Sequence, residues 1–410
     1  MGNIPVIRYQ TIVIGGGAAG LMAAISAGRR GQRVLIIEKN DAIGRKILVT
    51  GNGRCNLTNI NITPNKYYGE NTKCLHNIFS RFSHKETIAL FEELGVRFKT
   101  EEFGRVLPVT DRASTVVDAL GAEICRLKIK TNLGERVTGL VSAAGVWNVV
   151  TDKNTYRSEC VILAAGGKSY PQLGSTGDGF DIARELGHRI IEPRPGLVPL
   201  ELTGNWFQQL SGVTVNAEIS LTVKEKLIIR RSGELLFTHF GISGPLVLDL
   251  SRLITDGINK PDNLVTVNFF PDYNSLKLAQ FLNTRWRSQP QKTLANSLFG
   301  LMPKKLCTVL LAGLNLQTDT RSGQIPKKQT QLIAEQLARF PLEIKRHRPF
   351  AESMVTAGGV SLDEVNTRTM ESLKAKGLYL AGEVLDIDGI SGGYNLQFAW
   401  STGYMAGLQL

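Results

Sequence analysis

Residues 9–20 read YQTIVIGGGAAG, and this stretch decides the fold. A short apolar run rich in β-branched residues leads directly into Gly15-x-Gly17-x-x-Gly20, which opens a helix expected to end near Arg30. Residues 33–38 form a second apolar run, RVLIIE, whose last residue is acidic. A strand, a glycine turn, a helix and a second strand closed by an acidic residue are typical of a dinucleotide-binding βαβ unit. We therefore expect an α/β fold with a Rossmann-like parallel sheet.

The glycines of this turn have different tasks. In the dinucleotide fingerprint the first permits the tight turn, the second lets the backbone approach a pyrophosphate, and the third lets the helix pack closely on the strand. The N–H groups at the start of the helix bind the phosphates, and the acidic residue accepts hydrogen bonds from the adenosine ribose. The cofactor-binding residues expected from this unit are Gly15, Gly17, Ala18, Ala19, Gly20, Glu38 and Lys39.

An uncharged stretch, Thr11–Gly28, is as long as a membrane span. Ten of its 18 residues are Gly or Ala, which favours the strand, turn and helix of the βαβ unit instead. The N-terminus has no secretory signal pattern, and the five scattered cysteines form no CxxC pair. We therefore expect a cytoplasmic protein with no membrane span and no metal site. Asp386 and Asp388 are expected to be solvated loop carboxylates.

The length of 410 residues and a change of composition near residue 190 indicate more than one domain. Pro193, Pro195 and Pro199 mark a linker-like crossing, and a last helix is expected at 394–408. We predict one nucleotide-binding domain built from both ends of the chain, with a second domain inserted between them. The expected ranges are 1–192 and 350–410 for the first domain and 193–349 for the insert, which is β-rich at 193–272 and helical at 273–340.

Most of the formal net charge of +12 lies in the middle third, since residues 196–349 hold 19 Lys and Arg against 11 Asp and Glu. Within this insert, Arg321–Arg348 contains seven basic and two acidic residues. A basic surface attracts polyanions such as nucleic acid. A basic protein without such a partner would have the same net charge, so both interpretations remain.

Two further motifs resemble those of flavoproteins with two dinucleotide-binding domains. Residues 161–167, VILAAGG, and 377–383, GLYLAGE, are similar to their second and third FAD motifs. The resemblance assigns the ribityl chain to Glu383, where many members carry Asp, and places the start of the last helix against the isoalloxazine ring. No second GxGxxG follows a strand, so NAD(P)H would have to reach the flavin without a dedicated domain.

Longer motifs resemble one family, the BaiN/RdsA family of FAD-dependent oxidoreductases, some of which are labelled aminoacetone oxidase-like. The motifs are TGNGRCNLTN at 50–59, FTHFGISGP at 237–245, TAGGV at 356–360, GEVLD at 382–386 and GGYNLQ at 392–397, with Gly44-Arg45-Lys46. The resemblance implies a discontinuous FAD domain whose insert has a β-barrel-like part and a small helical part. It adds to the expected FAD site Gly44, Arg45, Lys46, Gly51, Asn52, Gly53, Arg54, Cys55, Asn56, Gly166, Gly167, Gly382, Glu383, Gly392, Gly393, Tyr394 and Asn395.

The family resemblance implies two kinds of substrate, steroid-like bile acids with an activated double bond and uridine in ribosomal RNA. We expect an enzyme that uses FAD, with NAD(P)H as external donor, and that reduces a C=C bond. The leading substrate is uridine in ribosomal RNA, bound through the basic insert at 196–349. The alternative is a small-molecule enoyl reductase or amine oxidase with no nucleic-acid partner. A non-catalytic flavin-containing RNA-binding protein is a third class.

Reduction of a C=C bond needs a hydride and a positioned acid. Cys55 in the TGNGRCN loop is a candidate proton donor, and the alternative is a small buried cysteine that fills the loop. His239 is a candidate for orienting the substrate or for acid–base work, and the alternative is a hydrogen-bonded structural histidine. Arg45, Lys46 and Arg54 are either partners of flavin or phosphate charge or ordinary surface cations.

Overall fold

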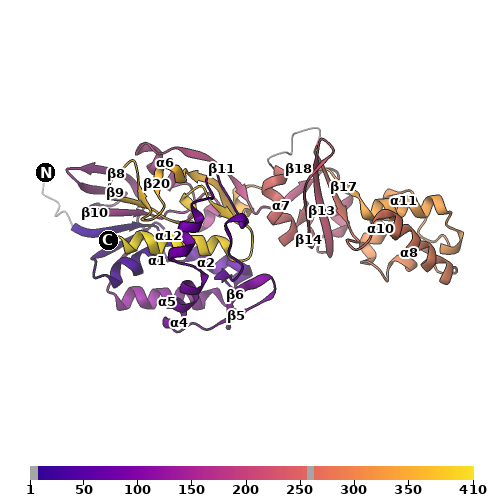
Figure 1. Cartoon of the computed structure of the whole chain (residues 1–410), viewed down its shortest axis with the longest axis horizontal. Helices are drawn as coiled ribbons and strands as arrows, with labels where there is room; N and C mark the ends of the chain where they lie inside the picture. Colours follow the sequence, from indigo (N-terminus) through magenta and orange to yellow (C-terminus); the bar gives the residue numbers. More distant parts are fainter. Residues whose placement is uncertain (1–7, 256–262) are drawn as a thin grey trace. The chain divides into compact units, whose positions relative to one another are not determined.

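The chain forms two units, each with its own hydrophobic core (Figure 1). The structure, a computed structural model, describes residues 8–255 and 263–410. The first unit joins the chain up to Gly196 with Phe350–Leu410, and the second is Leu197–Pro349. The first unit is therefore assembled from both ends of the sequence.

A mixed sheet whose central strands are parallel forms the centre of the first unit. Its strand order is β20-β21-β22-β10-β1-β2-β7, with β1 parallel to both of its neighbours, and the hairpin strands β8 and β9 extend from β10. The central strands are continuous apolar runs because both faces of the sheet are covered; all five residues of β2 are buried. The bounds are β1 (Arg8–Ile14), β2 (Val34–Glu38), β7 (Lys130–Leu133), β8 (Val137–Ala143), β9 (Val146–Thr151), β10 (Thr155–Leu163), β20 (Val365–Asn366), β21 (Glu371–Ser372) and β22 (Leu378–Leu380).

Helix α1 (Ala18–Arg29) packs against the last helix, α12 (Tyr394–Leu408), and most residues of both are buried. Small residues allow the close approach. A Cβ atom at Gly403 would lie 2.3 Å from the carbonyl oxygen of Ala19, and one at Gly407 would lie 2.3 Å from that of Ala23. The N-terminal βαβ helix and the C-terminal helix therefore form one packed layer, and the predicted helix at 394–408 is confirmed.

Shorter elements complete the first unit. Strand β11 (Ile190–Gly196) pairs with β19 (Val355–Val360), so the two segments that flank the insert lie side by side. Pro193 and Pro195 lie in β11 and not in the expected linker, and Pro193 falls at a register irregularity of this strand. The boundary between the units falls after Gly196. The other elements are α2 (Arg45–Val49), β3 (Thr58–Asn59), β4 (Tyr67–Tyr68), α3 (Leu75–Arg81), α4 (His84–Glu93), β5 (Phe98–Thr100), β6 (Arg105–Pro108), α5 (Ala113–Arg126), α6 (Asp178–Glu185) and β23 (Asp388–Gly389).

The second unit combines a curled antiparallel sheet with a group of helices. The strand order is β17-β16-β13-β14-β15-β12-β18, and the two strands at its ends follow one another in the chain, separated by Glu343. The sheet must therefore curl back toward itself, as a barrel-like part requires. The sheet part contains β12 (Leu200–Leu202), β13 (Thr214–Val223), β14 (Lys226–Phe237), β15 (Gly241–Ser243), α7 (Pro245–Thr255), β16 (Asn263–Asn268), β17 (Phe340–Leu342) and β18 (Ile344–His347). The helical part, which lies between β16 and β17 in the chain, contains α8 (Ser275–Ser288), α9 (Leu294–Leu298), α10 (Lys304–Gly313) and α11 (Lys327–Ala338).

The predicted α/β class with a Rossmann-type sheet is confirmed. The uncharged stretch Thr11–Gly28 is most of β1, the glycine turn and most of α1. In the part of the chain that the structure describes, no helix combines the length and apolar character that crossing a membrane needs.

Candidate functional site

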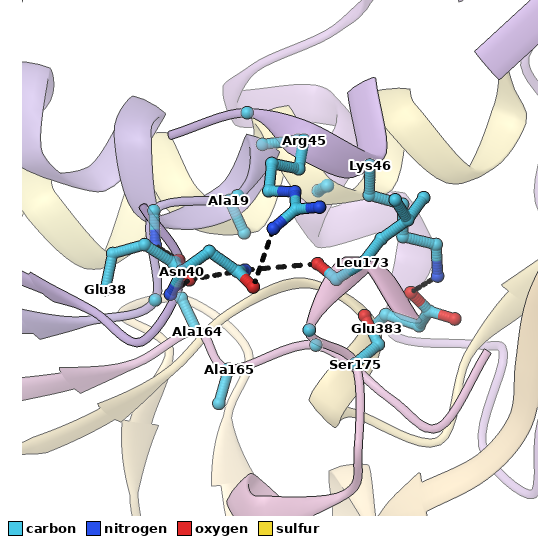
Figure 2. Close-up of a pocket in the computed structure, with 18 of the residues that line it drawn as sticks. Ala19, Glu38, Asn40, Arg45, Lys46, Ala164, Ala165, Leu173, Ser175 and Glu383 are labelled. Atoms are coloured by element: carbon cyan, nitrogen blue, oxygen red, sulfur yellow. Dashed lines mark hydrogen bonds and ion pairs between the residues drawn. The ribbon is translucent and has the colours of Figure 1, made fainter. Parts of the chain in front are cut away.

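A cavity in the first unit lies at the carboxyl ends of β1, β2, β10 and β22. This edge of a parallel α/β sheet is where ligands of such folds bind. Figure 2 shows Glu38 at one end of the cavity and the Lys46–Glu383 pair at the other. Of the residues expected from the sequence, the cavity is lined by Gly15, Gly17, Ala18, Ala19, Glu38, Lys39, Gly44, Arg45, Lys46, Gly166, Glu383 and Asn395.

The glycine turn after β1 has three different environments. Gly15 has a φ of +103°, and a Cβ there would lie 2.4 Å from the carbonyl oxygen of Ala164. A Cβ at Gly20 would lie 1.9 Å from the carbonyl oxygen of Gly15. A Cβ at Gly17, in contrast, would have no atom within 4 Å. The first and third glycines are thus required by packing, whereas the second keeps open a space where a ligand can approach the backbone.

The start of α1 offers hydrogen-bond donors to this space. The first turn has neither an acidic residue nor a side-chain cap, and the first bond of the helix runs from Leu21 N to Gly17 O. The N–H groups of Ala18, Ala19 and Gly20 therefore precede the intrahelical ladder. Uncapped N–H groups and the positive end of the helix dipole suit a pyrophosphate.

Hydrogen bonds hold the Glu38 side chain in place beside the glycine turn, in a position to bind a polar ligand. Its side chain is buried, and its carboxylate accepts hydrogen bonds from Gly16 N at 2.6 Å, Asn40 N at 2.8 Å and Asn40 Nδ2 at 2.7 Å. A carboxylate has about four acceptor positions, so it can still accept a ribose hydroxyl. The glycine turn, the free helix start and Glu38 together fit the adenosine diphosphate half of FAD.

Figure 2 shows Lys46 beside Glu383 at the opposite end of the cavity. The Glu383 carboxylate accepts hydrogen bonds from Lys46 Nζ at 2.6 Å and from Thr356 N at 2.7 Å. Thr356 Oγ1 in turn accepts from the backbone N–H groups of Lys168 and Ser169 at 2.8 and 3.1 Å. The longer side chain at Glu383 is therefore a positioned carboxylate, and Thr356 is a positioning residue that sequence reasoning gave no role, although it lies in the TAGGV motif.

The start of α12 also borders the cavity. Asn395 lines the cavity, and its side-chain amide donates to Gly389 O and accepts from Gly389 N, both at 2.8 Å. Gly393 has a φ of +103°, and a Cβ there would lie 2.3 Å from the carbonyl oxygen of Thr58. The helix has no acidic residue or side-chain cap in its first turn. Two helix starts, of α1 and α12, thus bring positive dipole ends to one cavity.

Several expected site residues lie behind the cavity lining. Gly167 and Gly382 allow close packing, since a Cβ would lie 2.3 Å from Thr356 Oγ1 in the first case and 2.7 Å from Ala19 Cβ in the second. Arg54 forms an ion pair with Glu101 at 3.0 Å. Among the described residues, the expected members that do not line the cavity are Gly20, Gly51, Asn52, Gly53, Arg54, Cys55, Asn56, Gly167, Gly382, Gly392, Gly393 and Tyr394.

Cys55 is fully buried, and burial raises the pKa of its thiol to about 12. A group with such a pKa is a poor acid at neutral pH, and Cys55 does not line the cavity. The structure favours the buried-cysteine interpretation over the proton donor. His239 lies exposed in the second unit, in the turn between β14 and β15 and beside Phe240.

The expectation for Asp386 and Asp388 was wrong, because both side chains are buried. Asp386 Oδ2 accepts a hydrogen bond from Glu70 N at 2.8 Å, so this carboxylate holds a loop. Within residues 8–255 and 263–410, no three His, Cys, Asp or Glu side chains come together as a metal site.

Three charged residues near Glu38 line the cavity but were missed from the sequence. Asp178 pairs with Lys39 and with Arg136, both at 2.8 Å, and Glu135 accepts from the hydroxyl groups of Thr151 and Tyr156. Hydrogen bonds keep the pKa of the Glu135 carboxyl below its usual value despite the opposing effect of burial. No motif marks these residues, because Glu135 and Arg136 lie in the loop between β7 and β8 and Asp178 lies at the start of α6.

The three glycine environments predict contrasting variants. Gly17→Ala is expected to fold normally, because Gly17 has a φ of −83° and its Cβ would meet nothing, but to bind FAD at least tenfold more weakly because the methyl group occupies ligand space. Gly20→Ala is expected to lower the melting temperature of the apoprotein, since its Cβ overlaps Gly15 O. FAD titration and thermal melting check both. Equal loss of stability in the two variants would contradict this assignment.

Comparison with known proteins gives consistent matches over nearly the whole chain. Residues 9–409 match the family model described as the HI0933-like protein Rossmann domain. The chain is 37% identical over 398 residues to the 3-dehydro-bile acid delta(4,6)-reductase of Clostridium scindens, covering 96% of this chain and 97% of the relative. It is 33% identical over 400 residues to the ribosomal RNA dihydrouridine synthase of Escherichia coli, covering 97% and 96%. The 3-ketosteroid delta1-dehydrogenase of Sterolibacterium denitrificans has a similar fold, with a TM-score of 0.52, 13% identity and coverage of 98% of both chains.

Proposed function

Since the chain belongs to the HI0933-like family and is a flavin-dependent oxidoreductase, we propose that it reduces a carbon–carbon double bond conjugated to a carbonyl group, in a uridine of ribosomal RNA. The names of both relatives describe saturation of such a bond, in a bile acid and in uracil. The reaction type is therefore better supported than the substrate, because one fold and one flavin site serve unlike molecules.

The residues of the cavity divide the work of holding FAD. The α1 start and Glu38 would hold the adenosine diphosphate half, and Lys46, Glu383 and the start of α12 would hold the other half. When bound and reduced by an external donor, the flavin would supply a hydride for one carbon of the double bond, and an acid must supply a proton to the other. We assign this acid to a group other than Cys55. NAD(P)H is the proposed external donor.

The distribution of charge in the second unit is the observation that favours RNA as the substrate. Its helical part, residues 273–340, has ten Lys and Arg against two Asp and Glu. The β part, residues 197–272, has six against eight. The positive charge of the insert is thus concentrated on the helices α8 to α11, as a surface that contacts phosphates would require.

The structure changes which cations are proposed as phosphate contacts. Arg346 and Arg348, which belong to the basic segment noted in the sequence, both pair with Glu201, so their charge is partly neutralised. Lys327 and Lys328, at the exposed start of α11, remain candidates. The aromatic residues Phe207 and Trp286 are buried and offer no surface for stacking bases.

A small-molecule reductase is the second candidate, and the 37% identity to the bile acid reductase favours it. Mapping of dihydrouridine in ribosomal RNA from cells with and without the gene separates the two. We expect one uridine position to lose its modification in the deletion strain, to regain it with the wild-type gene, and to regain less of it with the Gly17→Ala variant, whose FAD binding is weakened. An unchanged map, together with flavin-dependent reduction of a 4-en-3-one steroid by the purified protein, would establish the second candidate.

A further inference from the structure

Among the described residues of the first unit, Phe103 is the most exposed large apolar side chain, with 82% of its surface accessible. It lies in a short 3-10 turn (Glu102–Gly104) between β5 and β6 and has a φ of +60°. A phenylalanine in the left-handed region is uncommon and strained, and a conformation of this kind persists only where the surroundings fix it. Packing does not explain this residue, since it contributes almost nothing to the core.

Two asparagine side chains fix the turn. Asn59 Nδ2 and Asn61 Nδ2 donate hydrogen bonds to the carbonyl oxygen of Phe103 at 3.1 and 3.3 Å. Gly104 follows with a φ of +78°, and its carbonyl oxygen accepts from Ile60 N at 2.9 Å. Ile60 is itself 45% exposed beside the turn. The turn therefore holds an aromatic ring in solvent with a second apolar side chain next to it.

The same contacts place the turn near a helix start that borders the cavity. Asn59 Nδ2, which binds Phe103 O, also donates to Gly392 O at 2.9 Å. A Cβ at Gly392 would lie 3.4 Å from Arg105 Cγ, directly after the turn. Gly393 precedes α12, whose first turn lines the cavity through Asn395 and Leu396. The Asn59 side chain thus links the backbone of Phe103 to the segment that precedes α12, the helix whose start borders the cavity.

We propose that Phe103 is a stacking platform for a nucleobase next to the target uridine, an inference that rests on the proposed RNA substrate. An enzyme that acts on a base within RNA must take that base out of its stack, which leaves the neighbouring bases without a partner. Single-stranded RNA is typically held by stacking such bases on exposed aromatic rings, in any sequence, because every base has a π face. The platform is distinct from the phosphate contacts of the helical part.

The test compares wild-type protein with Phe103→Ala, Phe103→Trp and Leu373→Ala in binding a short fluorescein-labelled single-stranded RNA that contains the modified position. Leu373 is 64% exposed in the same unit and serves as the matched control. Phe103→Ala should weaken binding about tenfold, Phe103→Trp should retain affinity, and Leu373→Ala should have no effect. The salt dependence should keep its slope in Phe103→Ala, because no phosphate contact is removed.

The melting temperature of Phe103 variants distinguishes a stacking role of this residue from a structural role. Phe103→Gly removes an exposed side chain and relieves the left-handed strain, so its melting temperature should equal or exceed that of the wild type while its RNA affinity falls. If Phe103→Ala bound RNA with the affinity of the wild type, the proposed stacking role of Phe103 would be wrong and the proposed function would be unaffected. Absence of RNA binding by the wild-type protein itself would remove the proposed function and the platform with it.

Discussion

A chain in which residues 197–349 are replaced by a short glycine–serine linker is expected to fold and to retain FAD. The two ends of the insert leave the first unit at neighbouring positions. Gly196 pairs with Val355 in the β11–β19 ladder, and Ser353 Oγ donates a hydrogen bond to Gly196 O at 2.8 Å. A few flexible residues can therefore close the gap at little entropic cost. The first unit also keeps its own core, which is separate from that of the second.

Residues 1–196 alone are expected neither to fold nor to bind FAD. They lack β22, which pairs with β10, and α12, which covers α1 with ten buried residues. A domain is stable by only about 5–15 kcal/mol, and exposing these surfaces removes more than that. Glu383 and Asn395, which line the cavity, are lost as well.

Absorbance of the purified proteins and acid release of the bound nucleotide check both expectations. The linked chain should be yellow and should release FAD and not FMN, because the glycine turn and Glu38 are suited to an adenosine ribose and a pyrophosphate. Normal flavin binding by residues 1–196 would contradict a site completed from both ends of the chain. A colourless linked chain that FAD cannot reconstitute would assign part of the site to the insert.

The βαβ unit was predictable because its determinants are local. The apolar runs of β1 and β2, the spacing of Gly15, Gly17 and Gly20, and the acidic Glu38 lie within one short segment. The role of Glu383 was predicted from motifs that resemble those of known flavoproteins. The structure brings Glu383 and the residues of the βαβ unit, which are distant in sequence, to one cavity.

Other features depend on contacts that spacing does not reveal. Cys55 lies in a glycine-rich loop beside cavity residues, yet its backbone turns the side chain into the core, where burial raises the pKa of the thiol to about 12. Thr356 holds Glu383 only because β19 lies beside the 3-10 turn Gly382–Val384, which follows β22 in the chain. Asp386 and Asp388 look like loop carboxylates in sequence, but surrounding segments bury them. Each of these outcomes is decided by tertiary packing between segments far apart in the chain.

Replacing Lys304, Lys305, Lys327 and Lys328 together with Gln is expected to lower RNA affinity on the order of a hundredfold near 0.1 M salt. The four lysines lie exposed in the first turns of α10 and α11, helices whose first turns contain no acidic residue. Each phosphate contact contributes a log–log salt slope of about −0.7 for single strands, so loss of four contacts makes the slope shallower by about 3. The flavin spectrum and flavin reduction by NAD(P)H should not change, because no cavity residue is altered.

The matched control replaces Lys73, Lys128, Lys130 and Lys153, four exposed lysines of the first unit, with Gln. This variant has the same net charge as the first, so a general effect of charge would weaken RNA binding equally in both. If the helical part contacts RNA, the first variant should lose much of its RNA affinity and the control should lose little. A salt-insensitive affinity that neither set of changes alters would mean that α10 and α11 do not contact RNA, and it would favour the small-molecule substrate, for which the charge of the insert plays no part in turnover.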